Sequence, residues 1–363
     1  MKIAVPQHIR ALKPYVPGKP IAALEQEYGI ADAVKLASNE NPLGPSPKAL
    51  AALAAETAGL NRYPNGGSEK LVGAISARLG VAPECIILGS GSDDVISMLT
   101  RALLSPGDEV VIPQPTFLMY EFYARCAGAT PVFVPLSKRA IDLEAVARSV
   151  TPNTRIIFLC SPNNPTGQVI AGAQFAHFLS RIPKNILVVV DQAYAEYMRD
   201  PGALDGLRHV RQKHAVAVLR TFSKAYGLAG LRIGYGVMPP ELVRLLQRVR
   251  QPFNVNSLAQ AAATGALADD DFLEKSVRLA HEGLDFLWSQ LDRMGVRYHD
   301  SQANFFLIDV GRDADRCYEM MLRRGVIVRS MRAYGYAREI RLSVGLPVEN
   351  QRFLDAFETV LTT

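Results

Sequence analysis

The sequence predicts an α/β protein. We expect a large domain with three layers and a mostly parallel sheet, a smaller α+β C-terminal domain and an extended N-terminal arm. Seven short apolar runs between residues 85 and 238 alternate with helical segments, as in parallel sheets covered by helices on both faces. The chain has 363 residues, 48% of them hydrophobic, which is enough for one large core and one smaller one. The pattern changes after residue 240, where a second domain is expected.

The first elements follow from local signals. Residues 6–47 are rich in proline and glycine (KPYVPGKP, NENPLGPSP), which favours an extended arm over a packed helix; we place this arm at 1–45. The segments PKALAALAAETAGL and SEKLVGAISARLG carry apolar residues at helical spacing, and Gly80 ends the second. The expected strands are 85–89, 109–113, 130–135, 155–160, 186–191, 215–221 and 233–238. All of them fall in the large domain, which we place at 46–264.

The C-terminal part has a different pattern. A long helical stretch is expected from about residue 240 to 293. The segments RYHDSQANFFLIDV, GVIVRS and EIRLSVG then read as strands of the smaller domain, which we place at 265–363.

Charge and cysteine content exclude several classes. The net charge is +5 and the pI about 9.0, but the densest basic stretch, 323–341, interleaves arginines with aromatics, which suits phosphate or carboxylate recognition better than nucleic acid. The four cysteines are scattered without metal-binding spacing. The longest aliphatic run, 186–190, is too short to cross a membrane. We therefore expect a cytoplasmic protein with no metal, no nucleic acid and no membrane partner.

Four distinctive loops follow predicted strands: GSGSD (89–93), SPNNPTG (161–167), DQAY (191–194) and the pair at 223–224. In open α/β sheets ligands gather outside the carboxyl ends of the strands, so these loops are expected to share one edge.

Each loop alone also has a structural interpretation. The amides of Gly91, Ser92 and Asp93 suit an anion, but the loop also suits a helix start capped by serine or aspartate. Asn163 is either a hydrogen-bonding group or part of a structural turn. The acid Asp191 and the lysine Lys224 both lie in apolar surroundings, where a carboxylate could cap the next helix and a lysine could reach the surface.

Taken together, the loops have one economical explanation. A lysine, a buried carboxylate, an asparagine, a tyrosine and a phosphate-sized nest are the groups needed to hold pyridoxal phosphate, whose aldehyde bonds to lysine and whose ring nitrogen needs an anion. Pyridoxal 5′-phosphate is therefore the expected cofactor.

The motifs SNENPLGPSP, RYPNGG, GSGSDD, SPNNPTG, DQAY, TFSKAYGLAGLRIGY and IRLSVG resemble those of the fold-type I, pyridoxal-phosphate-dependent aminotransferases, in the family's order over residues 10 to 350. The resemblance implies that Lys224 forms the Schiff base and moves a proton, and that Asp191 pairs with the ring nitrogen. It implies that Tyr194 and Asn163 donate to the cofactor's phenolic oxygen. Phe117 would stack on the ring, or would be ordinary core packing.

The resemblance also implies a phosphate site and a partner subunit. The phosphate site would comprise Gly91, Ser92, Asp93, Thr221, Ser223 and Arg232. Tyr63 resembles the tyrosine that reaches the neighbouring subunit's cofactor phosphate, which implies a homodimer with shared active sites. The N-terminal arm is expected to pack with the small domain or the partner.

Four residues are expected at the substrate. Arg341 matches the family's arginine that binds the substrate's anionic end, for which a guanidinium is suited, and Asn163 is expected nearby. Arg329 and Tyr15 are further candidates, although Arg329 also fits an exposed surface arginine.

Within the family, the motifs are most similar to those of enzymes acting on histidinol phosphate. The expected reaction is transamination of L-histidinol phosphate with 2-oxoglutarate, giving imidazole acetol phosphate and glutamate, a step of histidine biosynthesis. Alternatives are transamination of aromatic amino acids and decarboxylation of threonine phosphate. A ligand-sensing transcription regulator fits poorly, because no room for a DNA-binding segment precedes residue 30.

Overall fold

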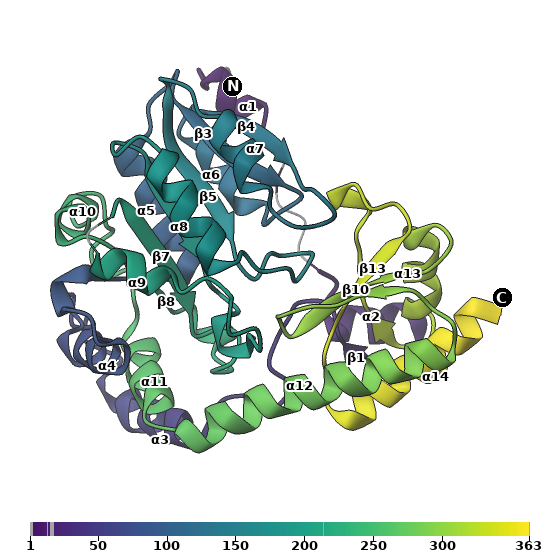
Figure 1. Ribbon diagram of the computed structural model, residues 1–363. Coiled ribbons are helices and arrows are strands. Elements are labelled where there is room, and N and C mark those ends of the chain that lie inside the picture. Colours follow the sequence, from purple (N-terminus) through teal and green to yellow (C-terminus); the bar gives the residue numbers. More distant parts are fainter. Residues whose placement is uncertain (1–2, 13, 15–17, 213, 363) are drawn as a thin grey trace.

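The computed structural model describes residues 3–12, 14, 18–212 and 214–362, which form a large lobe and a small lobe (Figure 1). The long helix α12 (Asp270–Arg293) runs from one lobe to the other. Residues of both lobes line a pocket between them.

A seven-stranded sheet forms the centre of the large lobe, in the order β2-β8-β7-β6-β5-β3-β4. Its strands are β2 (Ile86–Gly89), β3 (Glu109–Gln114), β4 (Thr130–Pro135), β5 (Thr154–Cys160), β6 (Leu187–Asp191), β7 (Val216–Thr221) and β8 (Gly234–Val237). β8 is antiparallel to both of its neighbours, and every other neighbouring pair is parallel. The seven predicted strands are confirmed, and so is the mostly parallel sheet.

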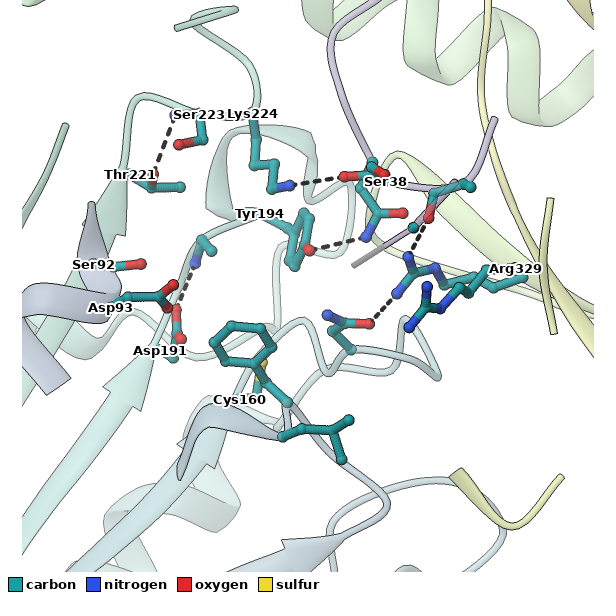
Figure 2. A pocket seen from close by; sticks show the side chains of 18 of the residues that line it. Ser38, Ser92, Asp93, Cys160, Asp191, Tyr194, Thr221, Ser223, Lys224 and Arg329 are labelled. Carbon is teal, nitrogen blue, oxygen red and sulfur yellow. Dashed lines mark hydrogen bonds between the residues drawn. The ribbon is translucent and has the colours of Figure 1, made fainter. Parts of the chain in front are cut away.

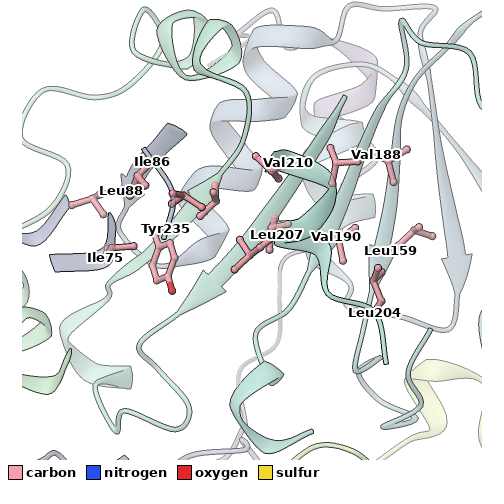
Figure 3. Packing of buried hydrophobic residues seen from close by; sticks show 14 of the residues in the cluster. Ile75, Ile86, Leu88, Leu159, Val188, Val190, Leu204, Leu207, Val210 and Tyr235 are labelled. Atoms are coloured by element: carbon pink, nitrogen blue, oxygen red, sulfur yellow. The ribbon is translucent and has the colours of Figure 1, made fainter. Parts of the chain in front are cut away.

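Helices cover both faces of this sheet, which confirms the three layers. Successive side chains of a strand point to opposite faces: Ile157 and Leu159 belong to one core, and Ile156 and Phe158 to the other. The first core includes residues of α3 (Pro47–Glu56), α4 (Glu69–Leu79), α7 (Leu143–Arg148), α8 (Gly172–Arg181), α9 (Gly206–Arg211) and α11 (Ser257–Leu267) (Figure 3). The second includes residues of α5 (Ser92–Leu103), α6 (Met119–Cys126) and α10 (Pro240–Leu246).

The small lobe is built on a second, antiparallel sheet. Its order is β12-β13-β10-β9, with β9 (Tyr298–His299), β10 (Phe305–Asp309), β12 (Arg329–Ser330) and β13 (Glu339–Ser343). A third core joins this sheet to α12, α13 (Ala314–Leu322) and α14 (Pro347–Thr362). The predicted α+β character of this part of the chain is confirmed.

The N-terminal segment is less extended than predicted. It contains the helices α1 (Gln7–Arg10) and α2 (Ile21–Tyr28) and the strand β1 (Val34–Lys35). The expectation of an arm without a packed helix is wrong for α2, because Leu24 is fully buried against the small lobe and Gly29, at φ 65°, ends the helix. β1 pairs in parallel with β11 (Val326–Ile327), so this part of the segment packs on the small lobe, as expected.

The predicted helical stretch from 240 to 293 is three helices rather than one. Pro252 lacks a backbone N–H and interrupts the pattern, and the Asn256 side chain accepts a hydrogen bond from the Ala259 amide at 2.8 Å to start α11. The predicted domain boundary at 264/265 falls inside α11. That helix packs on α3 and α4 of the large lobe, and the chain passes to the small lobe along α12.

Short 3₁₀ helices complete the described chain: η1 (Thr57–Gly59), η2 (Pro83–Cys85), η3 (Ala195–Tyr197), η4 (Ala229–Leu231) and η5 (Arg332–Tyr334). Of the helices in the described residues, none combines the length and the apolarity needed to span a bilayer.

Candidate active site

The pocket between the lobes gathers most of the predicted site residues (Figure 2). The strands β5, β6 and β7 are parallel, so the loops that follow them meet at one edge of the sheet. Those predicted residues that line the pocket are Ser92, Asp93, Phe117, Asp191, Tyr194, Thr221, Ser223, Lys224, Arg232, Arg329 and Arg341. The predicted convergence of the four loops is therefore confirmed.

Lys224 follows β7 and points into the pocket, where its Nζ donates a hydrogen bond to the Ser38 carbonyl at 3.1 Å. Burial, with the positive charges of Arg341 and Arg232, lowers the pKa of Lys224 from 10.5 to about 8. The alternative of a lysine reaching the surface does not hold. About a tenth of the amine is then neutral at pH 7 and about half at pH 8, and the neutral form is the one that a nucleophile or general base requires.

Asp191 ends β6 and is 4% exposed. One oxygen, Oδ2, accepts a hydrogen bond from the Tyr120 hydroxyl at 2.7 Å, and Oδ1 accepts one from the Ala193 amide at 3.1 Å. Burial raises the pKa of Asp191 to about 6, against the opposing effect of these hydrogen bonds. A carboxylate in such surroundings is stabilised by a cationic partner, such as a protonated ring nitrogen.

A backbone turn whose amides suit an anion lies at the start of α5. Gly91, at φ 82°, precedes the helix and leaves the amides of Ser92 and Asp93 in its first turn. The alternative of a serine or aspartate cap does not hold, because the capping position belongs to glycine. The Arg232 guanidinium lies so close that a Cβ at position 91 would be 2.6 Å from its Nη2. Helix amides and a guanidinium together suit a phosphate.

Two hydroxyl residues from the end of β7 line the same side of the pocket as the start of α5. The Ser223 amide donates to the Thr221 Oγ1 at 3.1 Å, which fixes the turn that precedes Lys224 (Figure 2).

The two asparagines of SPNNPTG differ in what they contact, and the expectation for Asn163 is corrected. Its side chain donates to the Pro115 carbonyl and the Thr166 hydroxyl and accepts from Thr116, and it does not line the pocket. Asn164 does line it, and its Oδ1 accepts a hydrogen bond from Arg341 at 2.5 Å. Since the Asn163 side chain is hydrogen-bonded to Thr166 of its own loop and to the segment after β3, Asn164 is the asparagine available to a ligand.

Arg341, on β13, reaches across from the small lobe. It is 6% exposed, donates to the Ala37 carbonyl at 2.7 Å and lies 5.2 Å from the centre of the Phe305 ring. Arg329, on the neighbouring strand, is paired in register with Arg341 and also lines the pocket. The pocket is thus lined by the start of α5 and Arg232 on the large lobe and by two arginines on the small lobe.

Tyr194 and Phe117 complete the wall. The Tyr194 hydroxyl accepts a hydrogen bond from the Asn39 side chain at 3.0 Å, and burial raises the Tyr194 pKa well above its usual value. The ring of Phe117 meets that of Tyr120 edge-on at 5.6 Å. Phe117 lines the pocket and also packs on the second core, which confirms the core-packing interpretation.

Tyr63 does not line this chain's pocket; it is 83% exposed and stacks on Phe253 with ring centroids 4.8 Å apart. Tyr15 lies outside the described residues. Among the residues that the structure describes, no group of three or more metal-ligating side chains is found.

Sequence reasoning missed Asn164, Ser38 and Asn39 among the pocket-lining residues, and Tyr120, which binds Asp191 from behind the pocket. Tyr120, in the first turn of α6, lies only three residues after Phe117, and this closeness in sequence could have suggested that it reaches the same site. Ser38 and Asn39 lie in the SNENP segment. That segment resembled the family's motif, but no local pattern ties it to Lys224 or Tyr194.

Comparison with known proteins gives the family. Residues 31–357 match the family described as aminotransferase class I and II. The chain belongs to this family. The aminotransferase is 45% identical to a histidinol-phosphate aminotransferase of Moorella thermoacetica, over 97% of this chain and 92% of the relative. It is 44% identical to the histidinol-phosphate aminotransferase of Desulfotalea psychrophila, over 99% of this chain and 96% of the relative.

Solved structures agree with this assignment. The histidinol-phosphate aminotransferase from Sinorhizobium meliloti, in complex with pyridoxal-5′-phosphate, matches the aminotransferase with a TM-score of 0.90 and 27% identity, over 98% of this chain and 97% of that one. The L-threonine-O-3-phosphate decarboxylase from Porphyromonas gingivalis matches with a TM-score of 0.81 at 23% identity, over 91% and 100%, and so shares the fold alone. The predicted family and fold type are confirmed.

Proposed function

We propose that this aminotransferase uses pyridoxal phosphate to transfer the amino group of L-histidinol phosphate to 2-oxoglutarate. The products are imidazole acetol phosphate and glutamate. The observation that carries the proposal is that Lys224 and Asp191 line one pocket, between an anion nest on one lobe and two arginines on the other. The names of relatives 43–45% identical over nearly the whole chain support the choice of substrate.

The pocket's residues suit this cofactor in kind. The nest at Ser92 and Asp93, with Thr221, Ser223 and Arg232, would hold its phosphate, and the close approach of Arg232 to Gly91 fits a site that a larger residue would fill. Asp191 would face the ring nitrogen and keep it protonated. When bound, pyridoxal phosphate supplies a ring that accepts the electron pair left on the substrate's Cα after its proton is removed.

Lys224 would then move that proton. Its Nζ has to be neutral to accept a proton from Cα, and a pKa of about 8 supplies the neutral amine. Tyr194 and, in place of Asn163, the pocket-lining Asn164 would donate hydrogen bonds to the cofactor's phenolic oxygen. Phe117 would stack on the ring.

Arg341 and Arg329 would bind the anionic end of each substrate, a phosphate or a carboxylate, through their guanidinium groups. Tyr15 remains a proposed third contact. Both substrates are anionic, so one pair of arginines can serve both half-reactions.

A substrate panel tests the proposal. The holoenzyme is given histidinol phosphate, phenylalanine, tyrosine, aspartate or threonine phosphate, and keto acid and carbon dioxide are measured separately. Histidinol phosphate is expected to be the best donor by kcat/KM, with parallel initial-rate lines against 2-oxoglutarate because the amino group is stored between two half-reactions. Turnover of phenylalanine without histidinol phosphate, or release of carbon dioxide from threonine phosphate, would overturn the substrate choice.

We further propose a cytoplasmic homodimer in which Tyr63 reaches the partner's cofactor phosphate. The exposure of Tyr63 and its distance from its own pocket support this role. In a mixture of equal amounts of Lys224→Ala and Tyr63→Ala chains, each mixed dimer would hold one intact site. Random exchange would therefore restore about a quarter of wild-type activity, whereas a Tyr63 acting within its own chain would restore none.

A further inference from the structure

A second connection between the lobes lies outside the pocket. The turn at Ser137–Ala140, between β4 and α7, carries Arg139 to the start of β13. The Arg139 Nη2 and Nη1 donate to the two carboxylate oxygens of Glu339, at 2.5 and 3.3 Å. In Figure 1 this loop of the large lobe lies beside the segment leading into β13. The guanidinium thus forms a bidentate pair with one carboxylate of the small lobe.

The contact is largely buried. The side chain of Glu339 is 8% exposed and that of Arg139 is 27% exposed. The Arg139 guanidinium also lies 5.1 Å from the centre of the Tyr336 ring, and the His299 Nε2 is 3.7 Å from Glu339. All of these partners belong to the small lobe, so Arg139 makes its main side-chain contacts across the interlobe boundary. Charged pairs that exclude water are coupled more strongly than surface pairs.

The backbone of the turn is held in an unusual conformation. Ser137 and Ala140 exchange both backbone hydrogen bonds at 2.9 Å, and the two residues between them have positive φ, 46° at Lys138 and 71° at Arg139. Such turns favour asparagine and glycine. Because neither residue here is of that kind, the conformation carries a conformational cost, and an observed outlier of this sort points to a function. The function that the contacts indicate is to direct Arg139 at Glu339.

Glu339 is connected to the active site through β13. It precedes Arg341 by two residues, so both side chains leave the strand on the same face. Arg341 makes its own contact across the boundary, to Asn164 at 2.5 Å. One strand therefore carries two consecutive interlobe links, and a shift of β13 that separates Glu339 from Arg139 also displaces Arg341.

We propose that the Arg139–Glu339 pair is an interlobe latch that positions Arg341 to receive the anionic end of the substrate. The role of Arg341 in this statement rests on the proposed function. Arg139 is a positioning residue, since it does not line the pocket. Without the latch, a smaller fraction of molecules has the small lobe placed so that Arg341 can bind the substrate. The apparent affinity for the substrate falls in proportion to that fraction. Chemistry in the saturated enzyme is unchanged.

The test compares Arg139→Gln with Lys138→Gln. The control removes the same charge from the same turn at an exposed residue. Loss of a charge-assisted hydrogen-bonded pair corresponds to roughly a tenfold change in an equilibrium. Arg139→Gln is therefore expected to raise the KM for amino donor and acceptor severalfold, with about tenfold as the upper bound, and to leave kcat within about twofold. Lys138→Gln should change neither, and Arg139→Lys should lie between because it keeps the charge without the fork.

Hydrogen exchange of the holoenzyme without substrate gives a readout that is independent of turnover. Amides of segments 137–140 and 339–343 are expected to exchange faster in Arg139→Gln and Glu339→Gln, and the double variant should show no further increase. Unchanged exchange, or additive effects of the two substitutions, would overturn the latch. If the wild type prefers another donor, the proposed substrate is wrong, but the same KM comparison with that donor still decides the latch.

Discussion

The pKa of Lys224 can be measured directly in the cofactor-free protein. Burial and two guanidinium groups bring this pKa from 10.5 to about 8. At pH 8 about half of the amine is then neutral, compared with about 0.3% for an unperturbed lysine, a difference of roughly 150-fold in reactive amine. Because the shift is downward, the neutral fraction rises with pH through about 8 and is nearly complete by about pH 9.5.

Competitive labelling with a trace of acetic anhydride follows that titration. The acetylation of Lys224, quantified by mass spectrometry against an added amine standard, should rise with pH to a midpoint near 8 and then level off. In Arg341→Gln the midpoint should move upward but stay below 10.5, because burial, the larger cause, remains. Arg338→Gln, at an exposed arginine on the same lobe, is the control. A labelling rate that keeps rising tenfold per pH unit to pH 10 would refute the depressed pKa.

Three further predictions concern the residues around the lysine. Asp191→Asn should retain the cofactor but lower kcat by about a hundredfold to a thousandfold, because a neutral amide cannot stabilise positive charge on the ring nitrogen; single-turnover kinetics measure this, and a rate near wild type would contradict the role. Tyr120→Phe removes a hydrogen bond that lowers the Asp191 pKa, so the acidic limb of the kcat/KM profile should move to higher pH; an unmoved limb would count against this coupling. Asn163→Ala should lower the free energy of unfolding by about 1–3 kcal/mol in denaturant titrations with little change in kcat. Asn164→Ala should lower kcat with little change in the free energy of unfolding. Equal effects of the two substitutions on kcat would contradict the distinction between them.

The strands, and the loop motifs that follow them, were predictable because each of these sequence signals is local. A continuous apolar run such as residues 186–191 indicates a buried strand, and parallel strands bring the loops that follow them to one edge. The sequence therefore predicts that Asp191 and Lys224 lie at one edge of the sheet, and both line the pocket there. The same reasoning did not show that β8 runs antiparallel to its neighbours, since an apolar run carries no direction.

The errors concern features that depend on distant contacts. Helix α2 has weak local signals amid proline and glycine, and it is stabilised by the burial of Leu24 against the other end of the chain. Asn163 and Asn164 are adjacent and chemically identical, so only the surroundings, Thr116 for one and Arg341 for the other, decide which faces the pocket. The pairing of Arg139 with Glu339 spans 200 positions and leaves no local trace in the sequence.

The hydrogen bond from the Asn39 amide to Ser343 joins residues 304 positions apart. A ribosome adding about 5–20 residues per second takes roughly 15–60 s to cover that distance. Lys224 precedes Ser343 by 119 positions, so it is made roughly 6–24 s before the strand that carries Arg341 is complete. The large-lobe residues that would hold the cofactor are therefore synthesised before the two small-lobe arginines that would bind the substrate.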